Sequence, residues 1–171
     1  MSYADLPRVP SFHLTSESLR DGDALKPAQT SKRFGVAGGK DESPQLSWSG
    51  APDGTNGYVV TVFDPDAPNA GGYWHWAVVN VPAGVHSLPA GAGASHLPSG
   101  AFQLKNDAGF PGYLGAAPPP GHGPHRYIVA VHAVDVEELG LDAGASTGDL
   151  VRKLTSHTLG RAVITGHFER R

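Results

Sequence analysis

Three apolar runs, each ended by turn-forming residues, constrain the fold of this chain more than any other feature. The strongest, Gly57–Phe63, contains six consecutive β-branched or aromatic residues and ends at Asp64-Pro65. Tyr73–Val81 and Arg126–Val134 have the same character. Runs of this length and composition are typical of strands, so the sequence predicts a sheet in which Gly57–Phe63 is a buried central strand.

Shorter strand candidates lie between stretches rich in glycine and proline. They are Ser11–Thr15, Gln45–Ser49, Ala101–Leu104 and Ala162–Phe168. The 23 glycines and 15 prolines are 38 of the 171 residues, nearly double their usual share, which excludes a fold made mainly of long helices. Seven strands between such loops predict a mainly β fold, a β-sandwich or a barrel-like sheet, rather than alternating βαβ units.

The sequence predicts one helix, near the end of the chain. Ser146 and Asp149 have the spacing of a capping box, and Gly160 suits the C-terminal stop. The apolar stripe between them is formed by Leu150, Val151, Leu154 and Thr158. The length fits a single domain, residues 1–171, without internal repeats or an interdomain linker.

Composition and charge exclude several classes of function. A chain without cysteine has no disulfide framework, thiolate zinc site, iron–sulfur cluster or thiol nucleophile. A net charge of −3, with 13 scattered Lys and Arg residues, argues against binding to a nucleic-acid backbone. The sequence contains no run of 18 apolar residues, which a membrane-spanning helix would need, and its first residues do not resemble a secretory signal. We therefore expect a cytoplasmic location.

Two long segments, Pro82–Pro98 and Asn106–Pro124, show no strand pattern and are expected to be loops. Loops of this length in a compact domain are uncommon unless they have a function. The second loop leads directly into a strong strand. It is therefore the first place to look for a site.

Three polar motifs lie at predicted strand ends. They are Asp64–Pro68, Trp74–Trp76 and Pro118–Tyr127. Taken singly, each has a structural explanation as a turn, as core aromatics around a hydrogen-bonded histidine, or as a rigid cover. Because the ends of neighbouring strands meet at a common rim, we expect Asp64, Asp66, His75 and His125 to converge on one pocket.

The alternation of side chains along a strand predicts the surroundings of His125. Arg126 points to the opposite face, where it suits an ion pair with one of the two aspartates, and Tyr127 shares the face of His125. His122, between two glycines, is expected to be exposed. His132 is expected to be a hydrogen-bonded residue of the sheet.

These motifs, in this order, resemble the phosphatidylethanolamine-binding protein family, in its prokaryotic branch similar to Raf kinase inhibitor proteins. Ser43–Trp48 ahead of them and Tyr113–Pro119 between them extend the resemblance, which runs from about Ser11 to Phe168. It implies a Greek-key β-sandwich of two antiparallel sheets, here with one short C-terminal helix, and a small anion pocket at one end of the sandwich.

The resemblance also implies the residues of the site. Matching motif positions, together with the N–H groups of the loop, give a ligand-binding set of Asp64, Asp66, His75, Ala116, Ala117, Pro119, His125 and Tyr127. The family usually has glycine where this chain has Ala117, so the extra methyl group is expected to narrow the approach to the backbone. No residue is assigned a catalytic or metal-binding role, and no cofactor is expected.

A ligand of the phosphoethanolamine headgroup type suits these residues. Cationic imidazoles and loop N–H groups attract its phosphate, and a carboxylate or the face of Trp74 or Trp76 attracts its ammonium group. The sequence thus predicts a non-enzymatic binding protein, a monomer or a homodimer, whose affinity rises as the pH falls through the range in which histidine titrates.

Two alternatives remain open from the residues. The same His/Asp cluster has the donors of a zinc or non-haem iron enzyme, a hydrolase or an oxygenase, although no H-x-H or H-x-x-x-H spacing supports it. The resemblance also permits a regulatory role in which the pocket rim binds a protein kinase or a serine protease, because animal relatives inhibit kinases and some relatives inhibit serine proteases.

Overall fold

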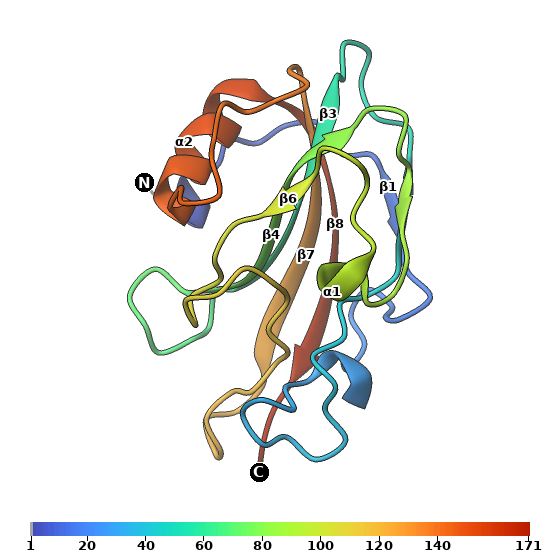
Figure 1. Cartoon of the computed structure of the whole chain (residues 1–171). Coiled ribbons are helices and arrows are strands. Elements are labelled where there is room, and N and C mark those ends of the chain that lie inside the picture. The colour runs from blue at the N-terminus through green and yellow to red at the C-terminus, as the bar shows by residue number, and fades with distance from the viewer. Residues whose placement is uncertain (1) are drawn as a thin grey trace.

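Two antiparallel sheets and one longer helix form three layers in the computed structural model, which describes residues 2–171 (Figure 1). The strands are β1 (His13–Thr15), β2 (Leu46–Ser49), β3 (Gly57–Asp64), β4 (Tyr73–Pro82), β5 (Ser87–Leu88), β6 (Phe102–Gln103), β7 (His125–Val134) and β8 (Thr158–Phe168). The α-helices are α1 (Ala92–Ser95) and α2 (Thr147–His157), with short 3₁₀ turns at Tyr3–Asp5 and Pro27–Gln29.

The larger sheet has the strand order β6-β4-β3-β7-β8, and the smaller one has the order β1-β2-β5. The chain adds β6 to the outer edge of β4 and then crosses over to pair β7 with the opposite side of β3. Every pairing between the named strands is antiparallel. The predicted mainly β fold of two antiparallel sheets is confirmed.

Strand β3 is buried along its whole length because both of its faces are covered. Val60 and Val62 belong to the apolar cluster between the two sheets. Val59 and Phe63, on the other face, belong to a second cluster with the helix α2. A strand buried on both faces reads as a continuous apolar run, which explains its strong signal in the sequence.

Helix α2 begins as predicted but ends differently. The Ser146 hydroxyl accepts a hydrogen bond from the Asp149 N–H at 3.0 Å, and the Asp149 carboxylate accepts one from the Ser146 N–H at 3.1 Å. The prediction that Gly160 stops the helix is wrong, since α2 ends at His157 and β8 starts at once. Gly160 lies inside β8, where a Cβ atom would come within 2.8 Å of Pro52, so close packing requires the glycine.

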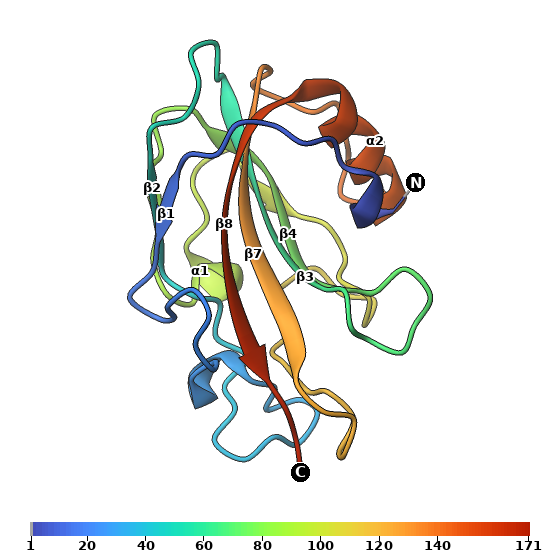
Figure 2. The ribbon, with the colours of Figure 1, turned by 180° about the vertical axis from the view of Figure 1, so that it is seen from behind.

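Short elements and strand ends depart most from the sequence prediction. The expected loop Pro82–Pro98 contains β5 and α1, and β8 starts at Thr158, four residues before the expected strand. Seen from behind, β7 and β8 run side by side to the lower end of the molecule, where the chain ends (Figure 2). None of the helices in residues 2–171 is long and apolar enough to span a membrane.

Candidate functional site

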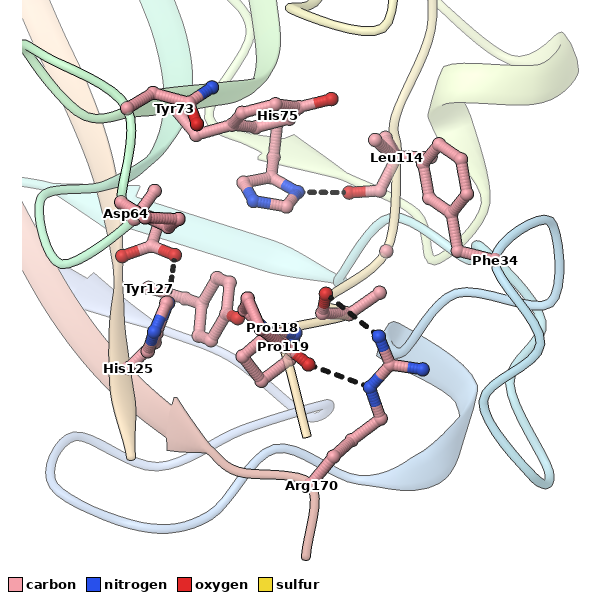
Figure 3. Close-up of a pocket in the computed structure, with 15 residues that line it drawn as sticks. Phe34, Asp64, Tyr73, His75, Leu114, Pro118, Pro119, His125, Tyr127 and Arg170 are labelled. Atoms are coloured by element: carbon pink, nitrogen blue, oxygen red, sulfur yellow. Dashed lines mark hydrogen bonds and ion pairs between the residues drawn. The ribbon is translucent and has the colours of Figure 1, made fainter. Parts of the chain in front are cut away.

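A cavity of about 380 Å³ lies at the end of the larger sheet where β3 stops and where β4 and β7 begin (Figure 3). Asp64 is the last residue of β3 and His125 is the first of β7. His75 lies near the start of β4, and the loops 67–69 and 114–119 form further walls. Antiparallel pairing brings these three strand ends together, as the positions of the motifs predict.

Asp64 and His125 form a buried pair at one wall of the cavity. The Asp64 Oδ2 atom lies 2.6 Å from the His125 Nδ1 atom, and the two side chains are only 4% and 2% exposed. An ionised carboxylate has no donor, so the His125 Nδ1–H donates this hydrogen bond. The other carboxylate oxygen of Asp64 accepts the N–H of Asp66 at 2.7 Å, which fixes the turn that follows β3.

His122 contacts this pair from outside. Its side chain is exposed, as expected, but its Nδ1 atom lies 2.6 Å from the Nε2 atom of His125. Because Nδ1 of a neutral His125 already carries the proton, its Nε2 accepts, and His122 donates. The sequence did not predict this contact between the two histidines of the loop.

His75 projects into the cavity from β4 (Figure 3). Its Nδ1–H donates to the Leu114 carbonyl oxygen at 2.7 Å, and its ring packs against those of Tyr73 and Tyr127 at centroid distances of 5.0 and 5.2 Å. Burial lowers the pKa of His75, against the opposing effect of the Leu114 carbonyl. In the ligand-free protein the imidazole of His75 is therefore neutral at neutral pH, and its unprotonated Nε2 atom can take up a proton.

Tyr127 supplies a hydroxyl group to the same cavity. Burial, and secondarily the charge of Asp64, raise the pKa of Tyr127, so the phenol stays protonated. The hydrogen bonds of the neighbouring wall residues, from His75 to Leu114 and from His125 to Asp64, do not use this hydroxyl. It can therefore donate to an acceptor placed in the cavity.

Asp66 lies outside the cavity, in contrast to the other acidic residue of its motif. Its carboxylate accepts two hydrogen bonds from the Arg126 guanidinium, at 2.9 and 2.8 Å, and one from the Arg126 N–H at 2.9 Å. These hydrogen bonds from Arg126 lower the pKa of Asp66 to about 2. The predicted ion pair of Arg126 with an aspartate is confirmed, and it leaves Asp66 to hold the loop rather than to face a ligand.

The loop before β7 contributes walls rather than a row of free N–H groups. Ala117 and Pro119 line the cavity, whereas Ala116 is buried behind it. The Ala116 N–H already donates to the Gln29 carbonyl oxygen at 3.1 Å, and the Gly115 N–H donates to the Asp41 carboxylate at 2.8 Å. These two donors are therefore engaged within the protein.

Neither tryptophan of the second motif reaches the cavity. Trp74 is buried in the cluster beneath α2, and Trp76 is buried between the sheets, where its indole N–H donates to Gln103. The expected contact of an ammonium group with either ring does not fit this arrangement. The aromatic faces at the cavity belong to Phe34, Tyr73 and Tyr127.

Comparison with known proteins agrees with this geometry. The family model of the phosphatidylethanolamine-binding protein matches residues 15–169, nearly the whole chain. The chain belongs to the phosphatidylethanolamine-binding protein family. This membership confirms the resemblance drawn from the three strand-end motifs.

Two relatives in Escherichia coli are similar to this chain over most of their length. YbhB is 45% identical over 157 residues, which cover 91% of this chain and 98% of YbhB. YbcL is 41% identical over 162 residues, which cover 93% of this chain and 88% of YbcL. The crystal structure of YbcL, described as a new member of the mammalian family, matches 94% of this chain and 99% of its own with a TM-score of 0.90.

A more distant structure shares the fold alone. It is the carboxypeptidase Y inhibitor in complex with its cognate proteinase, which is 18% identical with a TM-score of 0.56, over 95% of this chain and 85% of that chain.

Several cavity residues escaped the sequence prediction. Arg170 is the clearest case, since its Nε donates to the Pro118 carbonyl oxygen at 2.7 Å and a terminal nitrogen donates to the Ala117 carbonyl oxygen at 3.3 Å. Its own carbonyl oxygen accepts the Gly121 N–H at 2.8 Å. Arg170 lies beyond the last motif, so no sequence signal marks it. Tyr73, by contrast, directly precedes Trp74–Trp76, and the strand alternation that places His75 could have found it.

The histidines and carboxylates of the site do not form a metal-binding arrangement. No group of three or more His, Cys, Asp or Glu side chains in residues 2–171 is placed to hold a metal ion. His125 binds Asp64 with one ring nitrogen and His122 with the other, and His75 uses Nδ1 on a carbonyl oxygen.

Proposed function

We propose that this chain is a non-enzymatic binding protein whose cavity takes a small ligand that carries a phosphate and an ammonium group, as the phosphoethanolamine headgroup does. The observation that carries the proposal is the convergence of Asp64, His75 and Tyr127 on one cavity with apolar walls. Its volume of about 380 Å³ suits a headgroup, and few convergent polar groups among apolar walls are typical of small-molecule sites.

The charges of the site suit a zwitterion, because one carboxylate, Asp64, and one guanidinium group, Arg170, line the cavity. Asp64 is buried at the cavity wall, and an ionised carboxylate there repels a phosphate. A protonated His75 and the Tyr127 hydroxyl supply donors for phosphate oxygens, while Asp64 can accept an ammonium N–H. A ligand with both charges therefore satisfies both sides of the cavity.

The contacts of the cavity support binding rather than catalysis. Among the described residues that line it there is no Ser, Thr, Cys or Lys to serve as a nucleophile. Both ring nitrogens of His125 have partners, so His125 would first have to release one of them to act as a general base. Within residues 2–171 the Nε2 atom of His75 is free, but none of these nucleophiles lines the cavity for it to activate.

Calorimetric titration with glycerophosphoethanolamine between about pH 5 and 8 tests this function. Its phosphate is a diester and keeps one negative charge over this range, whereas a monoester gains a second charge near pH 6. Burial lowers the pKa of His75, so the free imidazole is neutral at pH 8, and a bound anion favours its cationic form. We therefore expect the affinity to rise as the pH falls.

The His75→Gln variant should lose the part of this pH dependence that comes from His75 and bind roughly tenfold or more weakly at pH 6, the range of a lost charged hydrogen bond. His13→Gln, at an exposed position of β1, is the matched control and should behave like the wild type. Inorganic phosphate, which lacks the ammonium group, should bind more weakly than the diester. A wild-type affinity that does not change with pH would contradict the proposed function.

We further propose that a protein kinase or serine protease binds at the cavity rim and that the protein resides in the cytoplasm. Support for the first comes from the family resemblance and for the second from the absence of cysteine. A pull-down with the wild type and Asp64→Ala tests the first, because a partner that depends on the cavity should be lost with the substitution.

A further inference from the structure

Three side chains form a hydrogen-bonded series from the buried cavity wall to the surface. Asp64 binds His125 at 2.6 Å, and His125 binds His122 at 2.6 Å. The first two are buried, and His122 is exposed on the loop between Gly121 and Gly123. The series therefore connects the wall of the cavity with solvent.

His125 separates two spaces. On one side it lines the cavity, and on the other it lines an outer groove together with His122, His167, Glu169 and the Asp66–Arg126 ion pair. The cavity side presents His75 and Tyr127. Proton access from solvent to the Asp64–His125 pair is thus available through the outer groove without passing through an occupied cavity.

The series can pass a proton from His122 to His125. Only one proton fits between the Nδ1 atom of His122 and the Nε2 atom of His125 at 2.6 Å. With both imidazoles neutral, that proton belongs to His122, and the Asp64–His125 pair carries the full negative charge of the carboxylate. When a second proton binds the Nε2 atom of His122, the shared proton can move to His125, which becomes an imidazolium beside Asp64 without movement of any heavy atom.

The fixed charges of the groove do not supply this neutralisation. Asp66 and Arg126 already pair with each other through two hydrogen bonds, and Glu169 adds a negative charge on the same side. His167 lines the groove, but no hydrogen bond joins it to the series within residues 2–171. A proton on His122 reaches Asp64 through two direct hydrogen bonds.

We infer that His122 is a positioning residue through which the Asp64–His125 pair takes up a proton from solvent when a phosphate-bearing ligand enters the cavity. The inference rests on the proposed function and adds a residue and a coupling to it. The phosphate of the ligand brings a negative charge into the cavity that His125 lines, and this favours protonation of His125 at its outer ring nitrogen, whereas the ammonium group lies at Asp64. His122 provides the route and the shared proton, and it does not touch the ligand.

Calorimetry in two buffers with different enthalpies of ionisation measures the number of protons taken up on binding. The probe is glycerophosphoethanolamine at about pH 7. In His122→Gln the amide keeps the contact with His125 Nε2, through either its NH2 group or its oxygen, but the side chain itself cannot be protonated. We expect this variant to take up fewer protons on binding than the wild type and to show a flatter rise of affinity between pH 8 and 6.

His167→Gln is the matched control, since it removes a histidine from the same groove outside the series. It should keep the wild-type proton uptake. Nitrogen NMR of the His125 ring should also show a larger protonated fraction of Nε2 in the ligand complex of the wild type than in that of His122→Gln.

The outcomes separate the inference from the function on which it rests. Equal proton uptake in His122→Gln and the wild type, with ligand bound in both, overturns the inference alone. Absence of binding to the wild type overturns both the inference and the proposed function. A fall in uptake in His167→Gln as large as that in His122→Gln would also contradict the inference, because the effect would then belong to the groove as a whole.

Discussion

At the scale of single residues, His132 is buried in the larger sheet without an acidic partner. Its Nδ1 atom accepts a hydrogen bond from Arg161 at 2.9 Å, and its Nε2–H donates to the Thr61 hydroxyl at 2.8 Å. Burial first, and then the charge of Arg161, hold the pKa of His132 well below the ordinary value. The sequence prediction of a hydrogen-bonded sheet residue is confirmed, and the imidazole is neutral in the folded protein.

This histidine makes stability depend on pH. In the unfolded chain it takes up a proton near pH 6.5, whereas in the folded protein it does not, so stability should be highest above about pH 6.5 and fall as the pH drops below it. His132→Gln should cost about 1–3 kcal/mol at pH 8, where hydrogen bonds are lost, yet lose less stability between pH 7 and 5. Urea unfolding at several pH values measures both effects.

His13→Gln, at an exposed site, should follow the wild-type curve. An unchanged slope of stability against pH in His132→Gln would show that other groups, such as the buried His75, account for the pH dependence.

At the scale of elements, the wall loop 114–119 crosses the segment 29–31 at Gly115. A Cβ atom at this position would lie 2.3 Å from the carbonyl carbon of Thr30. This is a backbone atom, so no change of rotamer can relieve the clash. Backbone hydrogen bonds from Ala116 to Gln29 and from Ser31 to Ala116, at 3.1 and 2.9 Å, hold the crossing together. The glycine is therefore required by close approach rather than by its backbone angles.

Gly115→Ala should cost about 1–3 kcal/mol of stability or more through overpacking. It should also weaken binding of glycerophosphoethanolamine, since the same crossing positions the cavity wall. Denaturant unfolding and calorimetry measure the two effects. Gly84→Ala is the control, because no atom lies within 4 Å of its added Cβ, and it should leave both quantities near wild type. A Gly115→Ala protein as stable as that control would contradict this role of the crossing.

Long elements could be predicted from the sequence, and short ones could not. The sequences of β3, β4 and β7 are continuous runs rich in β-branched and aromatic residues, because other layers cover both faces of these strands. β5 and α1 have two and four residues and no pattern of their own, and tertiary contacts such as that of the Ser43 hydroxyl with the Gly93 N–H hold this region. Gly160 misled the prediction because a packing glycine and a helix-stop glycine look alike in a sequence.

The residues of the candidate site likewise fall into those that the sequence could predict and those that it could not. Strand alternation and motif order placed Asp64, His75 and Tyr127 at one rim, because pairing of long strands fixes their register. The contacts of Arg170 and His122 depend on how loops fold back, which no periodicity encodes. Motif position alone also could not show that Asp66 turns outward to Arg126.

At the scale of the whole molecule, both apolar clusters pack against the central strand β3, one on each face, and this should make unfolding cooperative. Adjacent residues of β3 place their side chains in the cluster between the sheets and in the cluster beneath α2, so neither cluster can open without exposing the other face of the same strand. The tryptophans report on the two clusters separately. Trp48 lies between the sheets and Trp74 lies beneath α2.

Two variants that each retain one of these tryptophans, with phenylalanine at the other tryptophan positions, test this in urea. Within each variant, the midpoint from fluorescence should coincide with the midpoint from far-UV circular dichroism, so that any destabilisation by the substitutions cancels from the comparison. If the fluorescence of Trp74 changed at lower urea than the circular dichroism of the same protein, the α2 layer would open on its own. The chain would then behave as two units despite its single central strand, because the α2 layer would have separated from β3 before the sheets did.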